Sequence, residues 1–276
     1  MRPVSTRVTP CVASWYVFSM NLESWRAHTD DERIAIATKV ATAIGGTFTE
    51  LFGEDTLAAI THASGIELVL IPGGTFERGV RADEHAMMRA IEWAESEDSI
   101  EWLDQIAETP AEPATIAPFL LARYPLLSQH IEGWVIGDED SDESAVRIDS
   151  DTATAVLAEG PFRVPTSTEW EWVAREGGEL PFVDAADPDD AAAACEDIYD
   201  SSYDPDLANG WGIWGLPWGD WVGDGKQPRA GRGGAAMLYP WQGDELILQL
   251  AGLPDDSAGQ TQHCLRYALD VPADAL

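Results

Sequence analysis

Lysine is scarce in this sequence of 276 residues, since Lys39 and Lys226 are the only two. Lysine and arginine together number 16 against 49 aspartates and glutamates, which gives a formal net charge of −33. Binding to phosphate backbones and to anionic lipid needs a basic surface, so this balance argues against nucleic acid and against a membrane surface as partners. The balance is typical of a solvated acidic surface, and a specific basic partner is the alternative.

Cysteine is equally scarce. Cys11, Cys195 and Cys264 show no short spacing of the kind that a zinc motif or a disulfide framework needs. We therefore expect free thiols in a reducing compartment and a cytoplasmic protein. No apolar run is long enough to span a bilayer. The start is only weakly similar to a signal peptide, and Met20 is an alternative start that would leave residues 1–19 as a leader.

The sequence does contain one dense block of structural signals, F-R-V-P-T-S-T-E-W-E-W-V-A-R-E-G-G at residues 162–178. Apolar residues alternate up to Pro165, as in a half-buried strand that the proline ends. Thr166 and Glu169 have the spacing of a helix capping box, and Gly177 and Gly178 are a helix stop. The block predicts a strand end, a turn and a short capped helix.

Two carboxylates of this block resemble a catalytic pair only in sequence. Positions i and i+2 do not share a helical face, so Glu169 and Glu171 are predicted to act separately. We expect Glu169 to cap the helix and Glu171 to pair with an arginine such as Arg175. Trp170, with Trp211 and Trp214 further along, is predicted to lie in the core.

The remaining pattern consists of many short elements bounded by glycine and proline. It predicts helices over 29–44, 84–106 and 152–158, a second short helix from Phe48 to Ile60, and extended segments over 66–72, 75–78 and 115–127. Such a pattern favours one loop-rich α+β domain. We expect residues 1–60 to form a leader and helical extension, and residues 61–276 to form the main domain with an inserted helix near 84–106.

Several blocks, in this order, resemble the formylglycine-generating-enzyme/sulfatase-modifying-factor family. The blocks are I-P-G-G-T-F-E-R-G (71–79), residues 109–126, R-V-P-T-S-T-E-W-E-W-V-A-R (163–175), A-N-G-W-G-I-W-G-L (208–216), D-W-V-G-D (220–224), R-G-G (232–234) and H-C-L-R (263–266). The resemblance implies a C-type-lectin-like FGE-sulfatase fold, loop-rich with short strands and stabilised by buried tryptophans.

The departures from the family pattern bear on function. Two cysteines bind copper in the catalytic members, and the matching positions here are Leu238 and Gly243. Copper(I) needs soft thiolate ligands, so the resemblance implies a divergent, non-catalytic member. An iron-dependent branch of the family uses histidines, and none of the five histidines here pair at i and i+4.

The resemblance therefore implies a module that binds a protein or peptide partner, as an accessory component of a bacterial regulatory or defence system. Its binding groove would be lined by Trp218, Trp221, Tyr239, Trp241 and Arg266. Aromatic side chains dominate binding hot spots, although core packing is the alternative for each of them. The rival functions are a metal-dependent oxidase or hydroxylase that uses the same groove with other ligands, and a purely structural subunit.

A structural calcium site is the one cofactor that the sequence suggests. Its oxygen ligands would come from Asp204, Asp206, Asn209, Asp220 and Asp224, and solvated acidic loops are the alternative. The G-x-G-x-x-G match at residues 210–215 follows an Asp- and Pro-rich loop and carries two tryptophans. It is predicted to be a packed turn rather than a dinucleotide site.

Overall fold

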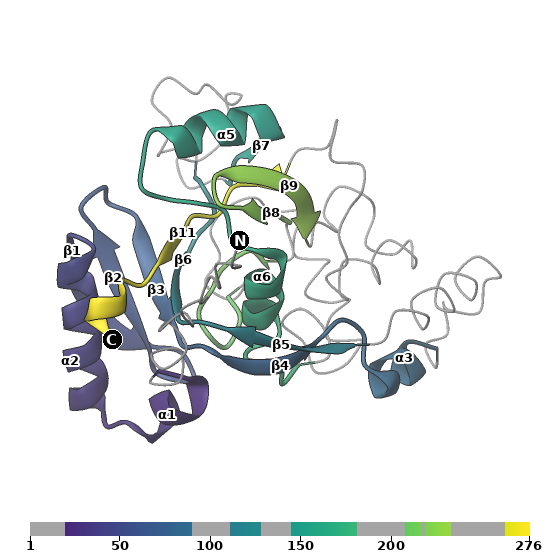
Figure 1. Ribbon diagram of the computed structural model, residues 1–276, viewed down its shortest axis with the longest axis horizontal. Coiled ribbons are helices and arrows are strands. Elements are labelled where there is room, and N and C mark those ends of the chain that lie inside the picture. The colour runs from purple at the N-terminus through teal and green to yellow at the C-terminus, as the bar shows by residue number, and fades with distance from the viewer. Residues whose placement is uncertain (1–19, 90–110, 128–144, 181–207, 217–218, 233–262) are drawn as a thin grey trace, which may run out of the picture.

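The computed structural model describes residues 20–89, 111–127, 145–180, 208–216, 219–232 and 263–276 (Figure 1). The elements are α1 (Leu22–Ala27), α2 (Asp30–Ala43), β1 (Gly46–Phe52), β2 (Leu57–His62), β3 (Glu67–Ile71), β4 (Gly74–Arg78), α3 (Ala82–Arg89), β5 (Glu112–Ile116), β6 (Phe119–Ala122), β7 (Arg147–Ile148), α5 (Ser150–Ala158), α6 (Ser167–Ala174), β8 (Asp220–Asp224), β9 (Gln227–Arg232), β10 (His263–Cys264), β11 (Ala268–Asp270) and the 3₁₀ turn η8 (Ala273–Ala275). These short strands and few helices confirm the α+β class.

The largest sheet has five strands in the order β1-β2-β3-β6-β11, and all neighbours are antiparallel. Its central strands are fully buried over Leu57–Ile60, Leu68–Ile71 and Phe119–Ala122. Helix α2 covers β1 and β2, and the C-terminal η8 lies against the same helix (Figure 1). The capping box of Thr29 and Glu32 begins α2 where the sequence predicts it.

The predicted second helix between Phe48 and Ile60 is wrong. These residues form the hairpin β1–β2, in which Phe48 pairs with Ile60. Gly53 (φ 73°) and Thr56 (φ 52°) make the turn, and the T-F-T-E-L-F run suits a pleated, half-buried surface. Residue 60, where the sequence predicts a domain boundary, lies inside β2 and therefore within the main sheet. Helix α3 covers the first residues of the insertion predicted near 84–106. Residues 90–106 of that insertion lie outside the described residues.

Two smaller sheets complete the described fold. One has the order β7-β10-β8-β9, and the other is a two-stranded ribbon of β4 and β5. Helix α6 packs against this ribbon and against β8, so it connects the two sheets. The strand β4 runs from the core of the molecule towards α3 (Figure 1).

Buried indoles tie these layers together. Trp170, Trp211, Trp214 and Trp221 are 0% exposed, which confirms the core assignment of the first three. Buried indole N–H groups need acceptors, and three of these indoles donate across the fold. The acceptors are Asp220 Oδ2 for Trp170 (3.0 Å), Asp55 Oδ2 for Trp211 (2.7 Å) and the Ile148 carbonyl for Trp221 (2.7 Å).

In the block at residues 162–178 the capped helix forms as the sequence predicts, whereas the predicted strand end is reduced to an isolated bridge between Arg163 and Ala268. Thr166 and Glu169 cap α6 reciprocally, and Glu169 also binds the Arg163 guanidinium through two contacts of 2.7 and 2.8 Å. Glu171 lies 3.2 Å from the Nε of Arg175, which confirms the predicted pair. After the helix, Gly177 adopts a left-handed conformation.

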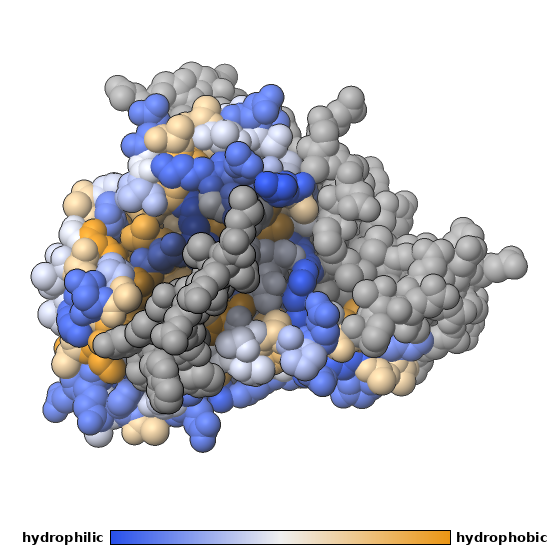
Figure 2. All heavy atoms as spheres, in the orientation of Figure 1, coloured by the Kyte–Doolittle hydropathy of each residue, from blue (hydrophilic) through white to orange (hydrophobic). Residues whose placement is uncertain are grey.

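Figure 2 shows one face of the molecule, on which many of the coloured residues are hydrophilic and hydrophobic residues lie between them. Among the described residues, Ile34 is the one large hydrophobic residue that is exposed. Within the described segments, no helix combines the length and the apolar character that a bilayer crossing requires.

Candidate functional site

The predicted groove residues fall into two groups. Trp218, Tyr239 and Trp241 lie outside the described residues, so for them the groove stays a prediction. Trp221 and Arg266 are 0% exposed. The expectation that these two side chains face a ligand is therefore corrected, because the Trp221 indole donates to the buried Ile148 carbonyl and Arg266 pairs with a buried carboxylate.

That carboxylate belongs to Asp220, one of the predicted calcium ligands. Its Oδ2 accepts from Arg266 Nε at 2.7 Å and from the Trp170 indole at 3.0 Å. Burial raises the pKa of the Asp220 carboxyl, while Arg266 and the Trp170 hydrogen bond favour its ionised form. Asp220 thus binds an arginine side chain in the core, whereas the sequence suggested that it binds a calcium ion.

The other predicted calcium ligands are not assembled in the described structure. Asn209 donates to the Val173 carbonyl at 3.0 Å and accepts from the Ile213 amide at 2.9 Å. Asp224 is exposed, and Asp204 and Asp206 lie outside the described residues. Within the described ranges, no three His, Cys, Asp or Glu side chains are grouped so as to hold a metal ion.

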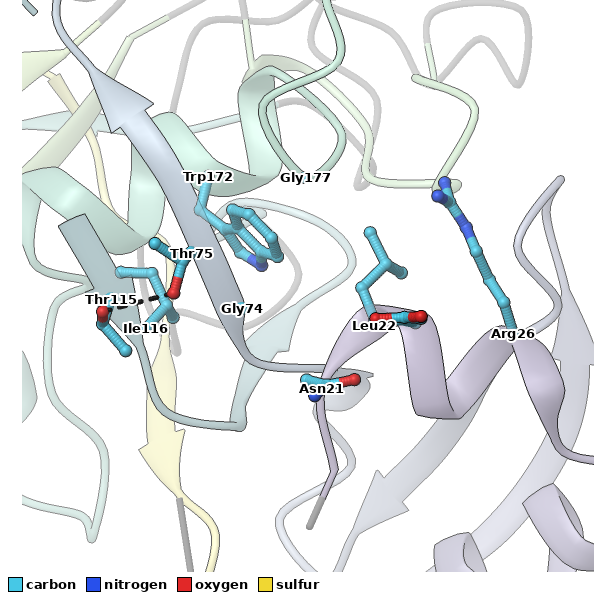
Figure 3. Close-up of a pocket in the computed structure, with 10 residues that line it drawn as sticks. Asn21, Leu22, Arg26, Gly74, Thr75, Thr115, Ile116, Trp172 and Gly177 are labelled. Atoms are coloured by element: carbon cyan, nitrogen blue, oxygen red, sulfur yellow. Dashed lines mark hydrogen bonds between the residues drawn. The ribbon is translucent and has the colours of Figure 1, made fainter. Parts of the chain in front are cut away.

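A pocket of about 460 Å³ opens between α1 and the β4–β5 ribbon (Figure 3). Its lining residues come from four separate parts of the chain. They are Asn21, Leu22, Glu23, Arg26, Gly74, Thr75, Thr115, Ile116, Trp172 and Gly177. We call this the α1–β4 pocket.

The backbone near Gly73 explains why the pocket forms beside β4. The Gly73 amide donates to the Met20 carbonyl at 3.0 Å, and the Leu22 amide donates to the Gly73 carbonyl at 2.8 Å. Asn21 then caps α1 and turns the chain away from β4. Among the described strands, β4 pairs with β5 alone, so its other edge has no strand partner there. Gly74 and Thr75 of β4 line the pocket together with Thr115 and Ile116 of β5 (Figure 3).

Two glycines and one indole fix the walls. A Cβ at Gly74 would stand 2.4 Å from Cη2 of Trp172, and a Cβ at Gly177 would stand 2.5 Å from Cδ2 of Leu22. The Trp172 indole is itself held by donating to the Pro72 carbonyl at 3.0 Å. The pocket is thus shaped by close packing rather than left open by a missing side chain.

The pocket's charged groups are largely engaged. Arg26 binds Asp55 through contacts of 2.5 and 2.8 Å and Glu179 at 2.5 Å, and the hydrogen bond with Asp55 raises the pKa of Arg26. Glu23 is the only other ionisable lining residue, and the Thr75 and Thr115 hydroxyls lie 3.3 Å apart. The lining set holds no nucleophile paired with a base, which is what covalent or general-base chemistry requires.

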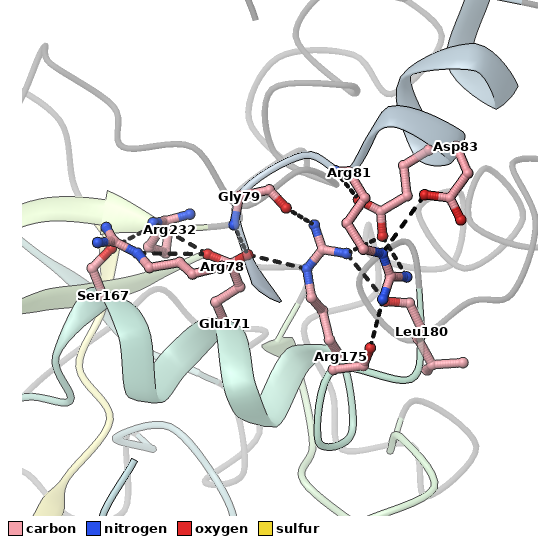
Figure 4. Close-up of polar contacts among 11 residues, drawn as sticks. Arg78, Gly79, Arg81, Asp83, Ser167, Glu171, Arg175, Leu180 and Arg232 are labelled. Atoms are coloured by element: carbon pink, nitrogen blue, oxygen red, sulfur yellow. Dashed lines mark hydrogen bonds and ion pairs between the residues drawn. The ribbon is translucent and has the colours of Figure 1, made fainter. Parts of the chain in front are cut away.

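An arginine network lies at the other end of β4, alongside α6 (Figure 4). We use this name for Arg78, Arg81, Arg175 and Arg232 together with the buried carboxylates Glu84 and Glu171. Glu171 Oε1 accepts from the Gly79 amide at 2.7 Å and lies 3.2 Å from Arg175 Nε. Arg175 Nη1 donates to Glu84 Oε1 at 2.6 Å, and Arg81 Nη2 lies 2.6 Å from the same oxygen. The network joins α3, β4 and α6.

A second pocket of about 410 Å³ is lined by the end of α5 (Val156, Leu157), by Ser64 and Ile66 between β2 and β3, and by Phe162 and Tyr267. Phe162 and Tyr267 stack there with ring centroids 4.8 Å apart, and burial raises the pKa of Tyr267. Sequence reasoning pointed to neither pocket.

Comparison with known proteins yields little. No family model matches the chain, and no curated protein matches it. Among solved structures, the chain is similar to the structure of PvdO from Pseudomonas aeruginosa, with 16% identity and a TM-score of 0.46. The match covers 82% of this chain and 98% of that one. A likeness this distant supports no conclusion about function.

Proposed function

We propose that this chain is a binding module that accepts a short segment of a protein or peptide partner in the α1–β4 pocket. The observation that carries the proposal is the lining of that pocket: walls fixed by close packing, a buried indole at the base, and polar groups without a catalytic pair. Its volume of about 460 Å³ falls within the roughly 300–1,000 Å³ typical of ligand sites.

The chemistry of the lining suits a peptide. Leu22, Ile116 and Trp172 offer apolar surface, and the Thr75 and Thr115 hydroxyls offer hydrogen bonds at the rim. Beside them runs the edge of β4 that faces away from β5, and strand edges present backbone donors and acceptors to an extended segment. A side chain of the partner would fill the pocket while its backbone lies along β4.

The fold family and the biological setting of the module are proposed from the sequence. The ordered blocks resemble the formylglycine-generating-enzyme family, and we propose its C-type-lectin-like fold for this chain. Leu238 and Gly243 stand where the catalytic members carry copper-binding cysteines, which supports a non-catalytic role. We further propose that the module serves a bacterial multi-protein system as an accessory component.

A peptide-display selection on the purified protein tests this proposal. Thr115→Trp would fill the pocket from an exposed position, so peptides selected on the wild type should lose binding to this variant. Thr49→Trp is the matched control, because Thr49 is likewise exposed and pairs with Thr61 across two strands at 3.0 Å, as Thr75 pairs with Thr115. Equal binding to the wild type and Thr115→Trp would refute the assigned site.

Metal analysis separates the proposal from an enzyme that uses non-standard ligands. Stoichiometric copper or iron in the purified protein, lost when His263 or Cys264 is replaced, would favour the metal-dependent oxidase or hydroxylase instead. Peptide binding that persists in metal-free protein would support the binding module.

A further inference from the structure

The arginine network carries more positive than negative charge. Four guanidinium groups meet two buried carboxylates, Glu84 and Glu171. Within the described part of the chain a third carboxylate, that of Asp83, lies 3.9 Å from Arg81 and is 82% exposed. In a chain of net charge −33 with 16 basic residues, this concentration of arginine is unusual. Buried charges are normally paired, and among the described residues the pairing of Arg232 is incomplete.

The imbalance is concentrated at Arg232. Its side chain is 2% exposed, and its Nε donates to the Ser167 hydroxyl at 2.7 Å. Its Nη1 is buried without a hydrogen-bond partner in the described structure. Its Nη2 lies 3.7 Å from Glu171 Oε2, which is too long for a hydrogen bond.

Arg78 also approaches this carboxylate oxygen. Its Nε is 4.0 Å from Glu171 Oε2, and its side chain is about a third exposed. Figure 4 shows Arg78, Arg232 and Ser167 gathered at one end of the network, away from Arg81 and Leu180. The partly exposed Arg78 and the buried Arg232 thus approach the same carboxylate oxygen.

The electrostatics agree with a missing anion. Burial lowers the pKa of Arg232 to about 10; Glu171 opposes this shift, and the positive charges of Arg78 and Arg175 add to it. A bridging water would satisfy hydrogen bonds but would leave this repulsion in place. A bound anion would accept a hydrogen bond from Arg232 Nη1 and offset the charges of Arg78 and Arg175, next to Glu171 Oε2, which is also buried without a hydrogen-bond partner among the described residues.

We propose that Arg78, Arg232 and Ser167 form a binding site for one oxyanion, a carboxylate or a phosphoryl group. The planar guanidinium fork matches two oxygens of such a group. Ser167 is the first residue of α6, where the helix dipole also favours negative charge. The site is distinct from the α1–β4 pocket and does not rest on the function proposed for that pocket.

Thermal unfolding in phosphate, acetate and chloride at pH 7 and equal ionic strength tests the site. Equal ionic strength is essential, because every salt screens the self-repulsion of so acidic a chain. We expect phosphate, acetate or both to raise the Tm of the wild type more than chloride does. A bound anion stabilises the folded state in proportion to its affinity, so the titration also gives a dissociation constant.

The variant Arg78→Gln removes one guanidinium at a partly exposed position and should weaken binding of the effective oxyanion at least tenfold. Arg229→Gln is the matched control on β9, the strand that also carries Arg232. Arg229 is exposed, and in the described structure its side chain donates one hydrogen bond, to Gln227 Oε1 at 3.3 Å. Arg78→Lys keeps the positive charge but lacks the planar guanidinium, so its affinity for the oxyanion should lie between that of Arg78→Gln and that of the control.

The anions also separate the two sources of the ligand. A Tm raised above the chloride value by phosphate alone indicates a phosphoryl group as the ligand, whereas a Tm raised by acetate indicates a carboxylate. Equal shifts in all three salts would overturn the proposal, since they would reflect screening alone. An unchanged affinity in Arg78→Gln would overturn it as well.

Discussion

The indole of Trp172 lies so close to Gly74 that a Cβ there would stand 2.4 Å from its Cη2. This contact joins α6 to the first residue of β4 and sets the base of the α1–β4 pocket. The Pro72 carbonyl holds the other end of the indole at 3.0 Å, so the ring has little freedom to retreat.

Gly74→Ala should therefore destabilise the protein, because the extra methyl group overpacks a well-filled site. We expect a loss of about 1–3 kcal/mol in the free energy of unfolding, measured in urea. Gly160→Ala is the control, because its Cβ would meet Phe162 at an ordinary 3.4 Å. Equal stability of Gly74→Ala and Gly160→Ala would show that Trp172 moves freely.

Asp220 and Arg266 form an ion pair in which both side chains are 0% exposed. Asp220→Asn leaves the guanidinium without its counter-charge, and we expect a loss of about 3–5 kcal/mol of stability. The double variant Asp220→Leu/Arg266→Met removes both charges and should be more stable than Asp220→Asn. Denaturant unfolding measures all three proteins, and a loss below about 1 kcal/mol in Asp220→Asn would contradict the buried pair.

Cys264 is 0% exposed, and burial raises the pKa of its thiol to about 12. The thiolate is the reactive form, so Cys264 should resist alkylation at pH 8 in the native protein and react fully in urea. The variant Cys11→Ser/Cys195→Ser isolates this thiol, and mass spectrometry counts the adducts. Rapid native labelling would show that the β8–β10 region opens in solution.

Asp55 stabilises the wall of the α1–β4 pocket by binding Arg26 and the Trp211 indole. Burial works against its charge, but these hydrogen bonds prevail and lower the pKa of Asp55 below its usual value of 3.8. A carboxyl with a lowered folded pKa contributes stability above its unfolded pKa and loses it as the pH falls further.

The wild type should thus be more stable than Asp55→Asn at pH 7, and the difference should shrink as the pH falls below 3.8. Thermal unfolding of both proteins from pH 7 to pH 2.5 measures this difference. A difference in stability between the two proteins that stays constant from pH 7 to pH 2.5 would mean that the charge of Asp55 does not stabilise the fold.

The block at residues 162–178 was predictable because its signals are local. A capping box, a proline and paired glycines act within a few residues, and the structure bears them out. The hairpin β1–β2 was missed because Phe48 and Leu51 have helical spacing, while the hydrogen bonds that decide the matter come from β2 and, beyond it, β3. Pairing partners distant in sequence leave no local signal.

The site was harder to predict for the same reason. Asn21, Gly74, Thr115 and Trp172 come from distant segments, and nothing in their spacing brings them together. The paired glycines at 73–74 and 177–178 were visible in the sequence, yet a turn and a helix stop explained them there. Trp221 and Arg266 were expected to line a groove, but both are buried, because their partners Ile148 and Asp220 come from distant segments of the chain.

Hydrogen exchange with and without a display-selected peptide tests the central claim most directly. If the partner segment binds in the α1–β4 pocket, backbone amides of residues 20–26 and 74–78 should exchange at least tenfold more slowly in the complex, because bound and edge-paired amides are protected. Protection confined to the second pocket, around Ser64, Phe162 and Tyr267, or unchanged exchange in α1 and β4, would contradict the account.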